Sequence, residues 1–245
     1  MQQIVDEAGS ARGRLGRWAS TLYEDAAAEN VRAIEVLLER AGAHTRLLDL
    51  GCDDGSLTAR WAARVGTKDV HGVEIVDERA KLAEERGITV ARADLNGLLP
   101  FEDETLDVIC SNQVIEHLHD TDLFVSEILR IVRPGGYAVV STENLASWHN
   151  IASLFFGWQP FSLTNVSHSS GGLGNPFAVH RGEGFEWKSW EHVRVFAYRG
   201  LSELFSTHGF SVESIAGAGY FPLPARFGRA DPRHAAFITV KARKH

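Results

Sequence analysis

Hydrogen-bond acceptors stand at or directly after the ends of four short apolar segments of this sequence. They are Asp49, Glu74, Asp94 and Asn112. If the four segments are strands of one parallel sheet, their carboxyl ends meet at the edge where such sheets bind ligands. Carboxylates and an amide at that edge can accept hydrogen bonds from ammonium, hydroxyl and amino groups.

The loop after Asp49 argues against a ligand with phosphates. Residues 47–56 read LLDLGCDDGS, whereas a dinucleotide fingerprint would need glycine in place of Asp53 and Ser56. Asp53 and its neighbour Asp54 would also repel a pyrophosphate at the start of the following helix. The loop therefore suits a ligand without phosphate.

S-adenosylmethionine (SAM) is such a ligand, and its groups match these positions. Asp49 can attract its ammonium, Gly51 lets the backbone come close, and Glu74 can accept from both ribose hydroxyls. Asp94 can accept from the adenine amino group, and Asn112 would lie beside the sulfonium. Glu74 alone does not choose between cofactors, because dinucleotide-binding folds also carry an acidic residue about 20 positions after their glycines.

Histidines provide a base for an acceptor that must lose a proton. The candidates are His117, His149, His168 and His192. Imidazole transfers protons efficiently near neutral pH. We favour His192 as the catalytic base and place His117 second; for each histidine the alternative is a packing or surface role.

An alternation of helices and strands would position these residues. Apolar periodicity predicts helices at 30–42, 56–65, 122–132 and 199–208, a helix opened by Asp77, strands at 47–50, 70–75, 88–93, 106–111, 137–142, 210–217 and 235–242, and a turn at 133–136. Such an order implies right-handed crossovers and a parallel sheet covered on both faces. We predict an α/β fold that is Rossmann-like and doubly wound, with a mostly parallel seven-stranded sheet, an antiparallel C-terminal edge strand and an aromatic-rich insertion after the fifth strand.

The chain is expected to form one domain over residues 1–245. Its parts are an N-terminal helical lid at 1–29, a cofactor-binding core at 30–142, an acceptor-site and lid insertion at 143–192, and a C-terminal helix and strands at 193–245. Long connections in compact domains are usually functional. We expect Trp148 and His149 to contact the acceptor and the glycine-rich run at 171–174 to let the insertion open and close.

Composition narrows the class of protein. With 44% hydrophobic and 23% charged residues, the chain has material for a sizeable core, and its net charge of -7 disfavours nucleic acid as a partner. There is no apolar leader or long apolar run, so we expect no membrane span and a cytoplasmic location. Cys52 and Cys110 are expected as buried thiols, and the absence of a cluster with ligand spacing predicts no metal site. The oligomeric state stays open.

Taken in order, LDLGCDDG, Glu74, Asp94, LDVICSNQVIEHL and RPGG resemble the class I SAM-dependent methyltransferases over roughly residues 30–142. In that family the first-loop glycines line the methionine and adenosine, and the acidic residues after the second and third strands meet ribose and adenine. The resemblance implies SAM as cofactor and S-adenosylhomocysteine (SAH) as product. The cofactor-binding residues expected from it are Asp49, Gly51, Cys52, Gly55, Glu74, Ile75, Asp94, Leu95 and Asn112. Asp53 departs from the family, which has the middle glycine of DxGxGxG there.

The later part of the chain resembles type 11-like methyltransferases of bacterial glycan, quinone and natural-product pathways. The segment from His192 to Phe210 resembles a pattern of HxRxF, helix and GF in enzymes whose loop after the fifth strand closes the acceptor site. Residues 142–160 resemble enzymes near polysaccharide or natural-product pathways. The resemblance implies methyl transfer to a small-molecule or glycan acceptor, with an oxygen of a sugar favoured. The alternatives are a quinone or other natural-product acceptor, a SAM-binding protein without catalysis, and an NAD-dependent oxidoreductase, which Asp53 and Ser56 oppose.

Overall fold

The computed structural model describes residues 21–167, 169–178, 181–182 and 191–245 of the chain. The strands are β1 (Arg46–Leu50), β2 (Asp69–Val73), β3 (Thr89–Ala91), β4 (Leu106–Asn112), β5 (Val132–Glu143), β6 (Ser211–Ala218) and β7 (Phe237–Arg243). The helices are α2 (Ser56–Val65), α3 (Asp77–Glu85), α4 (Thr121–Ile131), α5 (Trp148–Phe155) and α6 (Tyr198–Thr207), with the short helices η1 (Ile115–His117), η2 (Phe161–Leu163) and η4 (Ala225–Arg229). Residues 21–37 form an N-terminal helix. The expectations for residues 1–20 and for His168 lie outside the described residues.

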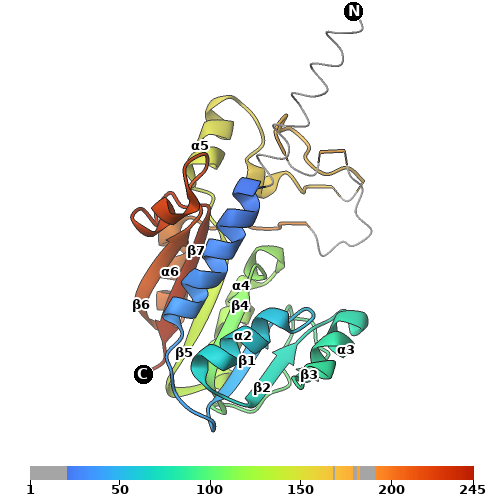
Figure 1. The fold of residues 1–245 in the computed structure, drawn as a ribbon, viewed down its shortest axis with the longest axis vertical. Coiled ribbons are helices and arrows are strands. Elements are labelled where there is room, and N and C mark those ends of the chain that lie inside the picture. Colours follow the sequence, from blue (N-terminus) through green and yellow to red (C-terminus); the bar gives the residue numbers. More distant parts are fainter. Residues whose placement is uncertain (1–20, 168, 179–180, 183–190) are drawn as a thin grey trace, which may run out of the picture.

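The strands form one seven-stranded sheet in the order β3-β2-β1-β4-β5-β7-β6 (Figure 1). Strands β1 to β5 pair in parallel with their neighbours. The order reverses at β1, because β2 and β3 lie on one side of it and β4 and β5 on the other. That reversal is the place where open parallel sheets bind ligands. The predicted doubly wound fold is confirmed.

The C-terminal strand β7 runs antiparallel to both β5 and β6. The predicted antiparallel direction of the C-terminal strand is therefore confirmed, but β7 lies one position inside the sheet and β6 forms the edge. The expected edge position of the C-terminal strand was wrong, and burial gives the reason. Six of the seven β7 residues are buried, as an interior strand requires, whereas β6 is mostly half-buried or exposed.

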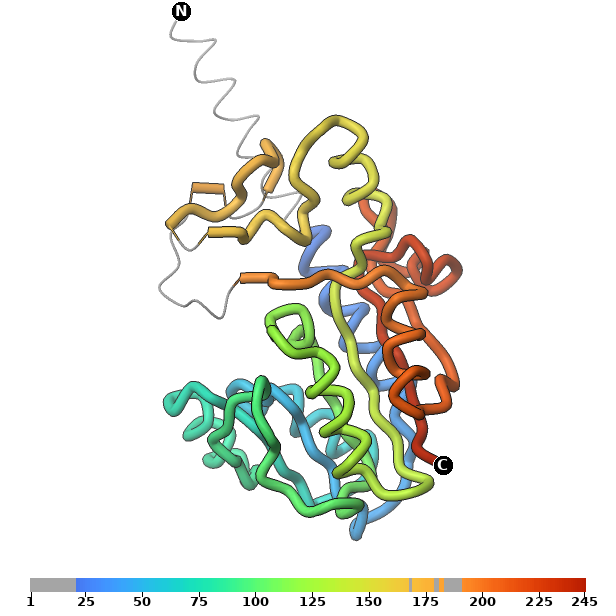
Figure 2. Tube along the Cα trace, turned by 180° about the vertical axis from the view of Figure 1, so that it is seen from behind, coloured from blue at the N-terminus to red at the C-terminus, as the bar shows by residue number. Residues whose placement is uncertain are grey.

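Helices cover both faces of the sheet, as the opposite views of Figures 1 and 2 show. On one face, Ile34 of the N-terminal helix and Trp61 of α2 pack in a cluster with Leu47 and Val139 of the sheet. On the other face, α4 and α6 pack their apolar sides on a larger cluster that contains Leu50, Ile109 and Val240, among others. None of the described helices is long and apolar enough to cross a membrane.

Two boundaries differ from the sequence expectation. Strand β5 begins at Val132, so the stretch 133–136 predicted as a turn is a bulge within the strand. Leu106 of β4 pairs with Val132 before the bulge, and Val108 pairs with Tyr137 after it. A left-handed Gly135, with φ of 81°, makes this bulge possible. The N-terminal helix also runs unbroken from residue 21 to 37 across the expected border between lid and core.

The described part of the insertion after β5 is tied together around α5 and η2. The Asn150 side chain donates to the Ser162 hydroxyl over 2.8 Å, which joins the two helices. Asn175, just after the glycine-rich run, donates to Ser153 over 3.2 Å and to the Gln159 carbonyl over 2.9 Å. Hydrogen bonds of buried amides thus hold this part of the insertion together.

Candidate active site

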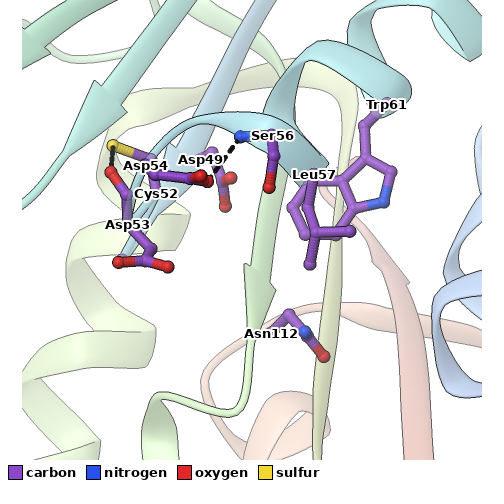
Figure 3. Close-up of a pocket in the computed structure, with 9 residues that line it drawn as sticks. Asp49, Cys52, Asp53, Asp54, Ser56, Leu57, Trp61 and Asn112 are labelled. Carbon is purple, nitrogen blue, oxygen red and sulfur yellow. Dashed lines mark hydrogen bonds between the residues drawn. The ribbon is translucent and has the colours of Figure 1, made fainter. Parts of the chain in front are cut away.

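A pocket of about 180 Å³ opens at the carboxyl end of β1, at the reversal of the strand order (Figure 3). It is lined by Asp49, Gly51, Cys52, Asp53, Asp54, Ser56, Leu57, Trp61 and Asn112. Four of the expected cofactor-binding residues are among them: Asp49, Gly51, Cys52 and Asn112. Parallel pairing of β1 with β4 brings Asn112 to the same wall as the first loop.

Asp49 contributes a buried carboxyl group to the pocket. The residue is 2% exposed; its Oδ2 accepts a hydrogen bond from the Thr58 hydroxyl, and its Oδ1 has no partner among the described residues. Burial raises the pKa of Asp49 to about 8, opposed by the Thr58 bond and assisted by the charge of Glu74. A buried acceptor without a protein partner suits a cationic group of a ligand.

Glu74, just beyond β2, holds the first loop in place. Its Oε2 accepts from the Asp53 amide over 3.0 Å, and its Oε1 accepts from the Val76 amide over 2.9 Å. Asp53 has a φ of 48°, in the left-handed region that glycine favours, and its carboxylate lies 3.2 Å from the Arg79 guanidinium. Asp53 therefore keeps the kind of backbone conformation that a glycine would adopt there.

Close packing explains the other small residues of the loop. Gly51 and Gly55 both have positive φ; a Cβ would lie 2.5 Å from Val114 Cγ2 at the first and 2.5 Å from Ile88 Cδ1 at the second. Gly55 thus allows the loop to pack closely but does not line the pocket.

Burial raises the pKa of Cys52 to about 12, so its thiol is neutral at pH 7. Both cysteines are free and buried, as predicted.

Five of the expected cofactor residues, among them Gly55 and Glu74, lie outside the lining of this pocket. Ile75, next to Glu74, is 61% exposed. Asp94 follows β3 and is exposed, and its Oδ1 accepts from the backbone and side-chain nitrogens of Asn96. Leu95 packs against the larger apolar cluster of the sheet. Their roles toward adenine and ribose stay predictions.

A buried amide, Asn30, connects the N-terminal helix to the pocket. Its Nδ2 donates to Asn112 Oδ1 over 2.9 Å, while its Oδ1 accepts from Ser141 over 2.7 Å and from Thr239 over 3.3 Å. The helix is thereby fixed to β4, β5 and β7, and the Asn112 side chain is oriented. The sequence analysis missed this residue.

A second group of polar side chains lies directly beyond β4. Glu116 and His117 belong to η1, and the His117 ring centre lies 4.8 Å from that of His192. Glu116 is fully buried; its Oε2 accepts from Thr142 over 2.9 Å, and its Oε1 has no partner among the described residues. Burial raises the pKa of Glu116 to about 8, and Glu143 adds to this effect. The two histidines proposed from separate parts of the sequence therefore lie together.

Backbone carbonyls fix the protonation of both rings. His117 Nδ1 lies 3.0 Å from the Glu191 carbonyl oxygen and His192 Nδ1 lies 2.7 Å from that of Ser162. A carbonyl only accepts, so both Nδ1 atoms donate, and each Nε2 is left with its lone pair in the neutral ring. Burial, followed by the proximity of His192, lowers the pKa of His117 to about 4. The His117 ring is therefore neutral at pH 7, and its Nε2 lone pair is free of a proton.

The two residues expected to contact the acceptor lie at the start of α5 and face different surroundings. Trp148 stacks on His234 at 4.4 Å and donates its indole N–H to the Tyr220 hydroxyl over 2.7 Å. His149 packs between Phe161 and Phe221, and burial lowers its pKa to about 4. His149 contacts η2, which also supplies the carbonyl that binds His192, whereas Trp148 lies toward the loop between β6 and β7.

Comparison with known proteins decides the family. The profile of a family described as a methyltransferase domain matches residues 22–215. The chain is a methyltransferase of this family. A probable SAM-dependent methyltransferase of Mycolicibacterium smegmatis is 32% identical over 74% of this chain and 60% of its own length. A ubiquinone biosynthesis O-methyltransferase of Mesorhizobium japonicum is 39% identical over 40% of this chain and 41% of its own length. The chain thus spans about 40 to 60% of the length of these relatives.

Solved structures agree on the fold. A SAM-dependent methyltransferase of Thermotoga maritima, described as a possible histamine N-methyltransferase, has a TM-score of 0.60 and 20% identity, and the match covers 99% of this chain and 97% of that one. At this level of identity the match shows the fold, which is that of SAM-dependent methyltransferases and agrees with the family match.

The residues at the end of β1 fit SAM. The unpartnered Asp49 Oδ1 matches an ammonium, the glycine at position 51 leaves no side chain between the ligand and the loop, and Asn112 presents an amide from β4. The residues that the sequence analysis missed are Thr58, Asn30 and Glu116. Only Glu116 carried a signal, namely an acidic residue within the apolar run VIEHL.

Proposed function

We propose that this methyltransferase transfers the methyl group of SAM to a hydroxyl oxygen of a small molecule. The observation that supports this proposal is the pairing of His117 and His192 beside the buried Glu116, four residues beyond Asn112 of the cofactor pocket. A hydroxyl becomes a better nucleophile when a base removes its proton. Imidazole rings whose Nδ1 contacts a backbone carbonyl present Nε2 for this task.

The protein's own groups have separable tasks in the proposed mechanism. Asp49 and Glu74 hold and orient the cofactor, whose sulfonium supplies the methyl group. His192 Nε2 accepts the proton of the acceptor hydroxyl, and the carbonyl of Ser162 keeps its Nδ1 protonated and the ring oriented. Since methyl transfer from a sulfonium needs little covalent assistance, alignment provides much of the acceleration.

The acceptor class rests on the relatives and on the surroundings of the histidines. The ubiquinone biosynthesis O-methyltransferase that is 39% identical to part of this chain favours a hydroxyl on a flat ring. Phe161 and Phe221, which enclose His149, offer ring faces near η2. The sugar hydroxyl expected from the sequence is the second acceptor class, with the segment 143–192 as its binding wall and lid. The proposal also includes a role of residues 1–29 as a further lid. It includes a cytoplasmic location as well.

The test is a transfer assay with methyl-labelled SAM. The purified chain is incubated with phenols, catechols and hydroquinones in one series and with sugars and nucleotide sugars in another, and products are identified by mass spectrometry. Label on a ring hydroxyl supports the proposal, and label on a sugar oxygen moves it to the second class. Label on nitrogen or carbon, with none on oxygen in either series, would refute transfer to oxygen.

A further inference from the structure

Three potential ligand groups converge where η1 meets the segment beyond residue 190. One atom each from Glu116, His117 and His192 can be chosen such that all three lie within 4.8 Å of one another. In tetrahedral coordination, zinc bonds of about 2.0 to 2.2 Å place ligand atoms about 3.3 to 3.6 Å apart, so the three groups need to close in by about 1 to 1.5 Å to bind an ion. We propose that this cluster, the Glu116 cluster, binds one divalent transition-metal ion.

The hydrogen bonds around the cluster are those of metal ligands. Each histidine donates its Nδ1 proton to a backbone carbonyl, that of Glu191 for His117 and that of Ser162 for His192. Such outer contacts orient ligating imidazoles and leave Nε2 for the metal. Glu116 Oε2 is held by Thr142, while its fully buried Oε1 has no partner among the described residues. An ion would satisfy that oxygen.

The kind of ion follows from the donor set. Two imidazoles and one carboxylate suit zinc, iron or manganese, whereas magnesium and calcium prefer oxygen ligands alone. Glu143, whose carboxylate lies 3.9 Å from His192 Nδ1, adds negative charge nearby. Three protein ligands leave a coordination position open, as in catalytic zinc sites. This inference departs from the metal-free site expected from sequence, because the ligands come from segments about 75 residues apart.

A catalytic consequence rests on the proposed function. The acceptor hydroxyl could bind the ion at its open coordination position, and the ion would lower the pKa of that hydroxyl. The histidines would then act as metal ligands instead of bases. Metal binding itself does not depend on the acceptor, because the ligand atoms belong to the protein.

The test measures zinc binding to the full chain without acceptor. Protein freed of metal with a chelator is titrated calorimetrically with zinc chloride, and magnesium chloride serves as the ion control. We expect one zinc ion per chain and weakening by more than about 100-fold in Glu116→Gln, His117→Ala and His192→Ala, since even outer contacts of ligands contribute about 10- to 100-fold. His208→Ala removes a histidine of the α6 end and should bind zinc normally.

Zinc that fails to bind stoichiometrically, or that binds equally well to all three variants, would overturn the inference. SAH titration of each variant checks that it is folded. X-ray absorption on the zinc-loaded wild type needs no variant: two imidazoles in the first shell support the site, and a shell of oxygen or sulfur alone refutes it. Zinc binding without methyl transfer to any acceptor would leave the site standing and count against the proposed function only.

Discussion

The Thr58 hydroxyl of α2 donates a hydrogen bond to Asp49 Oδ2 at the end of β1, and the other oxygen of that carboxyl group is buried without a partner among the described residues. One side chain thus joins strand to helix and keeps an acceptor for a ligand. Burial disfavours the ionised form of this carboxyl group, so ionising it in the absence of cofactor lowers the stability of the folded protein. The cofactor role proposed for Asp49 therefore opposes stability.

The affinity for SAH should rise with pH through Asp49. Because the pKa is raised to about 8, the carboxyl group is mostly protonated at pH 6 and can pair with the ligand's ammonium only after it ionises. We expect the association constant, measured by calorimetry between pH 6 and pH 8, to rise by up to about tenfold per pH unit. Asp49→Asn should bind weakly and without this dependence. An identical pH profile in the variant would contradict the assignment.

The same residue makes stability depend on pH. Between about pH 4 and pH 8 the folded protein holds a proton on Asp49 that the unfolded chain has released, so the free energy of unfolding falls as pH rises through this window. Asp49→Asn should remove this slope and have the higher Tm at pH 8 in the absence of SAM. Thermal melts of both proteins at pH 5 and pH 8 give the comparison; a lower Tm of the variant at pH 8 would argue against the buried charge.

Much of the fold could be predicted because its signals are local. Helix α2 has the bounds predicted from sequence, since Gly55 and Gly66 adopt left-handed conformations at its two ends. The bulge in β5 could not be predicted, because RPGG has the composition of a turn and only pairing with β4 and the C-terminal residues keeps it in the sheet. The Gly135 amide, for example, donates to the Lys244 carbonyl over 2.8 Å.

Replacing Asp53 should test why a non-glycine residue is tolerated in the first loop. Its φ of 48° costs an alanine about 1 kcal/mol or more, whereas glycine adopts it freely. We expect Asp53→Gly to keep the SAH affinity and roughly the stability of the wild type, and Asp53→Ala to lose about 1 kcal/mol in urea unfolding. Equal stability of the two variants would show that the loop relaxes to another conformation.

Glu74→Ala should weaken SAM and SAH binding. A charge-assisted contact to the ribose contributes about 1.5 to 3 kcal/mol, which corresponds to about 10- to 150-fold in Kd. The variant also releases the amides of Asp53 and Val76, so Glu74→Gln, which keeps one acceptor oxygen, should be intermediate. Glu78→Ala, in the first turn of α3, is the matched control. Unchanged affinity in folded Glu74→Ala would remove Glu74 from the cofactor site.

The polar contacts of the two sites were predictable only in part. Asp49 and Glu74 stand at strand ends and could be found from chain-local patterns. The Asn30 contact with Ser141 joins residues 111 positions apart, and the meeting of His117 with Glu191 spans 74 positions. Such pairings depend on how the strands are ordered in space, which composition and periodicity do not encode.

Asn30→Ala should destabilise the fold and also weaken cofactor binding. The substitution leaves buried partners on β4 and β5 unsatisfied, at a cost of about 2 to 4 kcal/mol in urea unfolding, and it frees the Asn112 side chain beside the cofactor pocket. Val36→Ala, on the exposed side of the same helix, should change the stability by less than about 0.5 kcal/mol. Equal effects of the two substitutions would mean that the buried amide is not an anchor.

His192→Ala should lower kcat by about 10² to 10⁴ while SAH affinity stays nearly intact, because the residue is assigned to the acceptor and not to the cofactor. His44→Ala, which removes an exposed histidine, is the control and should leave both quantities unchanged. A small loss of turnover would reduce His192 to a structural role. An equal loss of SAH affinity would mean that the two sites are wrongly separated.

The double variant of His117 and His192 distinguishes a base from a pair of metal ligands. If His192 alone removes the proton, His117→Ala should cost less than His192→Ala, and the double variant should lose somewhat more than either. If both rings bind one ion beside Glu116, each single substitution removes the ion, and the double variant should be no slower than the single ones, because residues that act as a unit are not additive. Turnover of all four proteins, with and without added zinc, measures the coupling. Additive losses that zinc does not change would favour the base, and the non-additive result would favour the ion.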